Sequence, residues 1–486
     1  MNLEKLKENN KIVQESQVVP SVVQMHYYLI EPTVLQNIYD WNKQIKEENV
    51  NTRALVRKIS IDIEMGNKKL KEELLPKIIS EIMEKEFLTK TGRSVTLNVT
   101  GGKIDSFREQ EETTGTVRVY DNGCIGVAGC LGAPNETELT ERAVESLKLG
   151  IPYPCSLDGK IEREELHEEE IIPLSKLVST MQSFLDRLGE ACPKFAFSNK
   201  IGLNYEKTEY RNSLGRHLVS SGRSVSVSLI AQNRGSGNLF DTAFGYGGVK
   251  FDADMLLRQF KAEYDAFFTP VDIEPGRYPV IMSPGSLFGT FLNHFIAEMY
   301  ASGASLLSGK LGQKVFSDKL SLRNDMSPET NPGVCFFDVE GCVAPDLRPA
   351  IIENGVFKGV LTTKKSAATF GLPNLGTAAA AYDGVPSLGF NGFYVDSTAK
   401  DLATLVPGKA IYVVMASGGD TTPSGHFATP VQMAYLMENG KLVGRLPELN
   451  IGGDFFELLG KDYIGAVIGD PLPDSLLCAV NMDVTK

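Results

Sequence analysis

A histidine and a glutamate four residues apart are the residues of this chain whose types and spacing could begin a metal site. They are His294 and Glu298, in the apolar stretch "FLNHFIAEMYASGAS". On a helix both would project from one flank, but a catalytic zinc takes about three protein ligands. The other histidines are scattered along the chain: His26, His167, His217 and His426. A hydrogen bond between His294 and Glu298 at the edge of a core is therefore favoured over metal binding.

A helix that begins near Ser283 would have to position this pair. Ser283 can cap the helix, and Pro284 suits its first turn. Apolar residues then recur at every fourth position: Leu287, Phe291, Phe295 and Met299. This ladder predicts one continuous helix whose apolar stripe is buried against its own domain, with the His–Glu pair on the flank.

Other motifs of this chain lack the partners that catalysis would need. The "HEEE" at His167–Glu170 lacks the second histidine of a zincin motif, so we interpret it as part of a solvated acidic linker. The glycine-rich "GSGN" and "GYGG" segments lie outside any strand–loop–helix context with a Walker lysine, and we interpret them as turns. A G-x-S-x-G elbow does not occur, and no cysteine has a motif-matched histidine.

Composition and charge limit the class of protein. The 486 residues exceed one compact domain of usual size, so two or three domains are expected. The 49 Lys+Arg against 61 Asp+Glu give a net charge of −12, which disfavours nucleic-acid binding. The apolar runs are too short to span a bilayer, the start "MNLEKLKENN" is unlike a secretory signal, and the seven cysteines form no C-x-x-C pair. These features predict a cytoplasmic protein with reduced thiols and no membrane partner.

Hydrophobic periodicity predicts an α+β fold in two domains. Helical spacing marks four segments: 71–85, 134–150, 175–191 and 252–268. Alternating apolar residues and the "DNG" turn at Asp121–Gly123 predict an antiparallel sheet, while "ENGVF" and "ENGKL" predict two later hairpins. The predicted units are a helical extension at 1–74, an α/β-layered N-terminal domain with an antiparallel sheet at 75–268, and a β-rich C-terminal domain at 269–486.

Several segments, taken in order, resemble those of a known family. In the first domain they are "FREQEETTGTVRVYDNGCIGVAG" and "PNETELTERAVESL"; in the second they include "EPGRYPVIMSPGSLFGTFL", "DVEG", "ASGGDTTPSGHFATPV" and "LNIGGDFFELL". By these segments the chain is identified as a member of the PmbA/TldD family over residues 75–486. That family contains zinc metallopeptidases that were formerly described as modulators of DNA gyrase.

The resemblance bears directly on the helix around His294. The TldD-like branch of the family carries H-E-x-x-x-H there. With His294 in the place of the first histidine, Phe295 stands in the place of the glutamate and Met299 in that of the second histidine. Glu298 is one residue short of that position, and Cys478 does not align with the family's metal cysteine. The resemblance therefore implies the TldE/PmbA branch, with no metal and no catalytic residue in this chain.

For that branch, the resemblance implies a non-catalytic subunit of a zinc metallopeptidase complex that acts on unfolded peptides or small proteins. A TldD-like partner would hold the zinc, and self-association is an alternative. Exposed strand edges in the second domain would suit extended peptides, although "LGTAAAAYDG" departs from a family turn containing glycine, asparagine and arginine. Two other hypotheses are a self-sufficient peptidase using His294, Glu298 and His426, and a DNA gyrase-associated module, which the acidic charge opposes.

Overall fold

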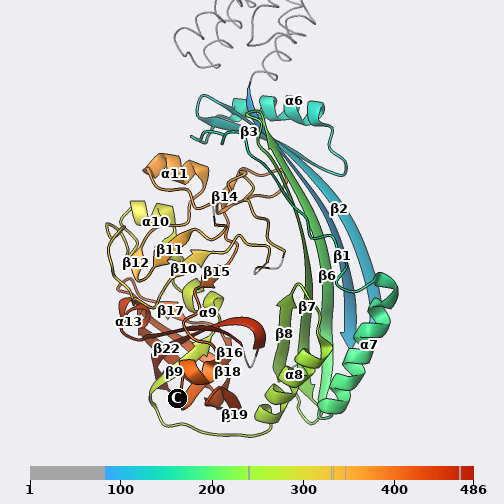
Figure 1. Cartoon of the computed structure of the whole chain (residues 1–486), viewed down its shortest axis with the longest axis vertical. Helices are drawn as coiled ribbons and strands as arrows, with labels where there is room; N and C mark the ends of the chain where they lie inside the picture. Colours follow the sequence, from blue (N-terminus) through green and yellow to red (C-terminus); the bar gives the residue numbers. More distant parts are fainter. Residues whose placement is uncertain (1–82, 239–240, 330, 332, 345, 470–471) are drawn as a thin grey trace, which may run out of the picture.

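The computed structural model describes residues 83–486, except 239–240, 330, 332, 345 and 470–471. The predicted extension at 1–74 lies outside the described residues, as does most of the predicted helix at 71–85, whose last residues Glu84 and Lys85 belong to a strand. The described part combines helices with mainly antiparallel sheets, so the predicted α+β class is confirmed (Figure 1). None of the described helices is long and apolar enough to cross a membrane.

The first sheet is mainly antiparallel and has the strand order β4-β3-β2-β1-β6-β7-β5, with β8 also pairing with β7. The strands are β1 (Glu84–Thr100), β2 (Lys103–Asp121), β3 (Cys124–Leu131), β4 (Ile151–Pro152), β5 (Glu162–Glu165), β6 (Phe195–Asn212), β7 (His217–Asn233) and β8 (Thr242–Gly248). Apolar residues alternate along β1 as predicted, since Val95, Leu97 and Val99 are buried. The β2–β3 turn has positive φ at Asn122 (51°) and Gly123 (75°), which confirms the predicted hairpin.

Three helices pack against this sheet close to where the sequence predicts them. They are α6 (Glu136–Ser146), extended by the 3-10 turn η2 (Leu147–Leu149), α7 (Leu174–Ala191) and α8 (Ala253–Phe267). The side chain of Asn135 caps α6 by accepting from the amide of Glu138. In Figure 1, α7 and α8 cover one end of the long strands, and α6 lies over β3 at the other end.

Two features of this sheet differ from what local sequence patterns suggest. The segment interpreted as a solvated linker contains β5, which pairs in parallel with the start of β7, because the unpaired sheet edge offers its backbone partners. The segments "FAFSN" and "GLNYEK" suggest separate strands, yet they form the single strand β6. Its neighbours β1 and β7 together pair with the whole of β6, which holds the backbone extended through the polar middle.

The C-terminal part holds a second eight-stranded sheet and smaller ones. The large sheet has the order β16-β9-β22-β20-β18-β17, with β19 on β18 and β21 on β22, while β12-β11-β10-β15 form a small sheet and β13 pairs with β14. The strands are β9 (Gly276–Met282), β10 (Leu322–Asn324), β11 (Ala350–Glu353), β12 (Val356–Phe357), β13 (Ala378–Ala379), β14 (Ser387–Leu388), β15 (Phe393–Val395), β16 (Lys409–Ala416), β17 (Asp420–Thr421), β18 (His426–Glu438), β19 (Lys441–Arg445), β20 (Leu449–Asp454), β21 (Tyr463–Gly469) and β22 (Leu472–Thr485).

Short helical segments connect these strands. They are α9 (Pro284–Gly289), the 3-10 turn η3 (Leu292–Phe295), α10 (Ala297–Ala301), α11 (Lys364–Phe370), α12 (Leu402–Leu405) and α13 (Phe455–Leu459). Both predicted "ENG" hairpins are confirmed. Asn354–Gly355 joins β11 to β12 and Asn439–Gly440 joins β18 to β19, with positive φ at all four residues.

One apolar core joins the first sheet to the C-terminal part. Phe195 of β6 and Phe260 of α8 belong to the same buried cluster as Tyr435 of β18 and Ala479 of β22. A second cluster lies within the C-terminal part. The boundary predicted at 268/269 falls in the connection between α8 and β9 and stays a prediction. The shared core packs the elements on both sides of that connection against one another.

Candidate functional site

The helix predicted to start at Ser283 is interrupted. Ser283 caps α9 as expected, its side chain accepting from an amide of the first turn (3.1 Å). The chain then continues as η3 and α10, with Ile296 between them in extended conformation (φ −87°, ψ 135°). Ile296 forms a parallel bridge with Leu361, whose amide donates to the carbonyl of Phe295 (2.7 Å). Because this pairing replaces the helical hydrogen bonds, the prediction of one continuous helix is wrong.

The interruption separates His294 from Glu298. The half-buried His294 accepts through Nδ1 from the amide of Leu306 (3.3 Å), and its ring centroid lies 5.2 Å from that of Phe455. Burial lowers the pKa of the imidazole, which favours its neutral form. Glu298 is exposed, and no hydrogen bond or ion pair joins the two side chains in the described part of the chain. The predicted His–Glu pair is therefore wrong.

The surroundings of His294 do not fit a metal ion. Its Nδ1 is occupied by a backbone amide, and within the described residues no group of three potential ligands in mutual reach includes His294, Glu298 or His426. Cys478 is buried in β22, where burial raises the pKa of its thiol to about 12. A thiol with that pKa stays protonated at neutral pH, whereas metals bind the thiolate.

A group of acidic residues that sequence reasoning missed is buried in the loop before β11. Asp338, Glu340 and Cys342 each offer a ligand atom within 4.8 Å of the others. Asp338 Oδ1 accepts from the amides of Glu340 (2.9 Å) and Cys342 (3.0 Å), and Oδ2 accepts from a third amide (3.0 Å). Glu340 Oε1 accepts from the Tyr153 hydroxyl (2.6 Å), and Oε2 accepts from the Lys364 amide (2.8 Å).

These contacts argue against a metal site in this acidic loop. Hydrogen bonds already occupy all four carboxylate oxygens. Burial raises the pKa of both carboxyl groups, and for Glu340 the neighbouring Asp338 raises it further. Burial also raises the pKa of Cys342 well above its usual value, so the group stays a thiol. A cation already lies beside the loop, because Lys364 Nζ is 2.9 Å from Asp158.

The acidic loop instead joins the C-terminal part to the first sheet. Arg118 of β2 is fully buried and donates to Glu86 of β1 (2.8 Å) and to the carbonyl of Val339 (2.7 Å). Arg216 donates to the carbonyl of Gly341 (2.6 Å). Removing one member of such a buried pair leaves its partner's charge unpaired, which is costly. In the sequence, only the "DVEG" segment pointed to this loop, because the arginines that contact it lie far away along the chain.

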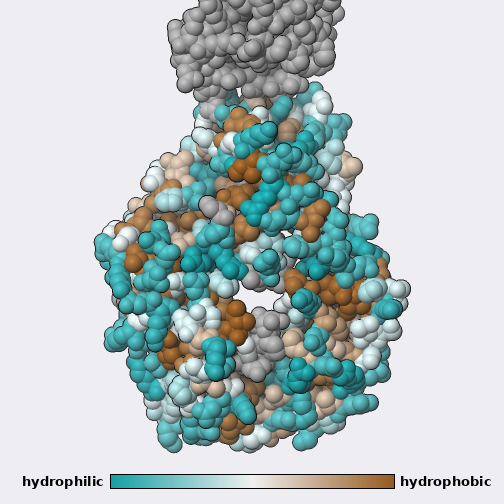
Figure 2. Space-filling view, viewed as in Figure 1, coloured by the Kyte–Doolittle hydropathy of each residue, from teal (hydrophilic) through white to brown (hydrophobic). Residues whose placement is uncertain are grey.

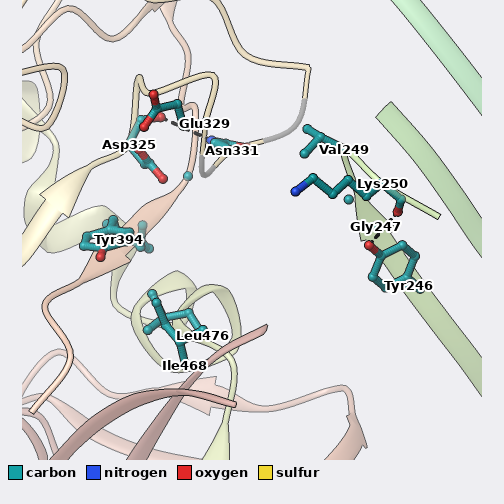
Figure 3. Close-up of a pocket in the computed structure, with 13 residues that line it drawn as sticks. Tyr246, Gly247, Val249, Lys250, Asp325, Glu329, Asn331, Tyr394, Ile468 and Leu476 are labelled. Carbon is teal, nitrogen blue, oxygen red and sulfur yellow. Dashed lines mark hydrogen bonds between the residues drawn. The ribbon is translucent and has the colours of Figure 1, made fainter. Parts of the chain in front are cut away.

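A cleft opens between β8 and the C-terminal part. Its volume is about 460 Å³, and Figure 2 shows the molecule hollowed at this place. The lining residues include the end of β8 and the loop after it on one wall, and residues after β10 and from β15 on the other: Tyr246, Gly247, Gly248 and Lys250, opposite Asp325, Glu329, Asn331 and Tyr394 (Figure 3). The "GYGG" segment, predicted to be a turn, is thus part of a strand at a cleft, whereas "GSGN" does lie in a turn.

Comparison with known proteins connects this fold to a family. The profile of the PmbA/TldA metallopeptidase C-terminal domain matches residues 275–467. A zinc metalloprotease TldD homolog of Saccharolobus solfataricus is 25% identical over 52% of this chain, which spans 61% of that protein, less than two thirds of its length. A metalloprotease of Archaeoglobus fulgidus is 24% identical over 77% of this chain and 90% of its own length. Residues 275–467 thus match a PmbA/TldD-family C-terminal domain.

Solved structures of other proteins share this fold. The crystal structure of TldE from Thermococcus kodakarensis superposes with a TM-score of 0.69 at 20% identity, covering 83% of this chain and 96% of that one. A protein of Thermotoga maritima described as a modulator of a DNA gyrase superposes with a TM-score of 0.66 at 18% identity, covering 86% of this chain and 99% of that one. At these identities the likeness shows a common fold and no more.

Proposed function

We propose that this chain is a TldE/PmbA-like, non-catalytic subunit of a zinc metallopeptidase complex that acts on unfolded peptides or small proteins. The observation that carries this proposal is the state of the segment aligned with the zinc motif of the TldD branch. Phe295, in the place of the catalytic glutamate, is fully buried, and its ring centroid lies 6.1 Å from that of Phe393. A phenylalanine in the core cannot activate water.

The other positions of this segment support the same function. Met299 replaces the second histidine and is half-buried. His294 uses Nδ1 to fix the backbone at Leu306. Glu298, one residue from the second-histidine position, points to solvent without contacting His294. A catalytic zinc needs about three protein ligands, and this segment supplies one histidine. The zinc, and the water it activates, would therefore belong to a TldD-like partner.

Elemental analysis tests this assignment directly. We expect protein purified without chelator to contain far less than one zinc per chain, and His294→Ala to leave the metal content unchanged, because too few ligands hold the ion. One zinc per chain that is lost in His294→Ala would contradict the proposal. That result would favour the alternative of a self-sufficient peptidase with a rearranged site.

A further inference from the structure

One edge of strand β8 faces the cleft. Among the described strands, β8 pairs with β7 and with no other. It lies on the side of the first sheet that faces the C-terminal part (Figure 1), and its last three residues line the cleft. The free edge of a strand offers backbone donors and acceptors to another extended chain.

The sequence of β8 leaves room for such a chain. At Gly245 and at Gly247, an added Cβ would meet no atom within 4 Å, so both positions open onto free space. Glycine within a strand often marks a place where a ligand or another backbone approaches closely. The cleft volume of about 460 Å³ lies within the range of small-ligand sites, roughly 300–1,000 Å³.

The loop after β8 presents a positive charge at the end of this edge. The Tyr246 side chain folds over Gly248, where an added Cβ would lie 2.2 Å from Oη, and the hydroxyl donates to the carbonyl of Lys250 (2.8 Å). This contact fixes the loop. Within the described residues the ammonium of Lys250 forms no ion pair, and Figure 3 shows it extending across the cleft toward the wall that carries Asn331. Such a group attracts a carboxylate.

We propose that, given the function proposed above, the cleft binds an extended peptide as an added strand on the free edge of β8, with a peptide carboxylate on Lys250. The carboxylate is either the peptide's C-terminus or the side chain of an aspartate or glutamate. Ile468, 43% exposed, and the partly exposed Leu476 line the cleft and receive apolar side chains that point to one face of the added strand. Backbone pairing gives affinity, and Lys250 fixes the position of the peptide along β8.

Fluorescence anisotropy with the full chain tests both contacts. The probe is a fluorescein-labelled, unstructured peptide of about ten residues, with a free C-terminus and no acidic side chain. We expect methylation of alternate backbone amides to weaken binding at least about tenfold, because it removes the donors that pair with β8. C-terminal amidation and Lys250→Ala should each weaken binding about tenfold, and together no more than either alone.

The controls distinguish a C-terminal carboxylate from a side-chain carboxylate, and the peptide site from the proposed function. Lys176→Ala, at an exposed position of α7, should bind like the parent. If a glutamate placed in the amidated peptide restores the affinity, a side-chain carboxylate can also bind Lys250. The strand-addition site would be overturned by any of three results. The N-methylated peptide binds as well as the parent peptide, amidation still weakens binding to Lys250→Ala, or no probe binds. Stoichiometric zinc with cleavage by the isolated chain would instead overturn the proposed function.

Discussion

The side chain of Glu263 shows how one residue sets a pH dependence. Glu263 lies in α8, buried against the shared core, and accepts a hydrogen bond from Gln259 Nε2 (3.3 Å). Burial disfavours the charged carboxylate and raises the pKa from 4.5 to about 7. The folded protein therefore holds this proton more tightly than the unfolded chain. The contribution of this group to the free energy of unfolding is fully present below about pH 4.5 and is lost as pH rises through about 7.

We predict that Glu263→Gln removes this pH dependence. The amide is neutral at every pH, so the variant should match the parent near pH 4.5 and exceed it by up to about 3 kcal/mol in unfolding free energy at pH 8. Urea unfolding at several pH values measures the difference. Glu141→Gln on the exposed face of α6 is the control. A difference between Glu263→Gln and the parent that does not change with pH would show that Glu263 ionises freely in the folded state.

At the scale of elements, the acidic loop depends on the backbone at Gly341. Its φ is +69°, and an added Cβ would lie 2.3 Å from the ring of Tyr210, which is fully buried in β6. We predict that Gly341→Ala costs roughly 3 kcal/mol, from left-handed backbone strain together with overpacking against a ring that cannot move away. Thermal unfolding measures this cost.

A matched glycine separates the two causes. Gly303 also has positive φ, +82°, but an added Cβ there meets no atom within 4 Å. Gly303→Ala should therefore cost only about 1–2 kcal/mol, the backbone strain alone. Equal losses in the two variants would mean that the contact between the acidic loop and Tyr210 adds nothing to stability.

Local chemistry explains which elements the sequence could predict. The Asn122–Gly123 turn and the Asn135 cap depend on residues within a few positions, and both are found as predicted. The segment through His294 also has apolar residues at helical spacing, and two of them, Phe291 and Phe295, are buried as this spacing predicts. The helix is interrupted because Ile296 pairs with Leu361, a contact that no local pattern encodes.

The acidic loop was missed for a related physical reason. Asp and Glu are usually exposed, so a single sequence gives no cause to bury Asp338 and Glu340. Their burial becomes tolerable only because Tyr153 and backbone amides, one of them from Lys364, reach them from other parts of the fold. The β8 cleft was missed likewise, since "GYGG" has the composition of a turn and forms a strand only by pairing with β7.

At the scale of the whole molecule, the shared core and the acidic loop hold the first sheet against the C-terminal part, with the cleft between them. In the function proposed above, this chain binds peptide while a partner supplies the chemistry. The segment aligned with the zinc motif contributes core packing through Phe295, whose ring centroid lies 6.3 Å from that of Phe455. Binding and cleavage would then reside on different chains.

Reconstitution of peptide cleavage tests this central claim most directly. An unfolded polypeptide would be incubated with this chain, with a TldD-like metallopeptidase from the same organism, and with both together, each with and without chelator. We predict that this chain alone gives no cleavage and that the mixture exceeds either protein alone by at least about tenfold, with chelator abolishing the activity. Robust, chelator-sensitive cleavage by this chain alone, lost in His294→Ala, would contradict the account.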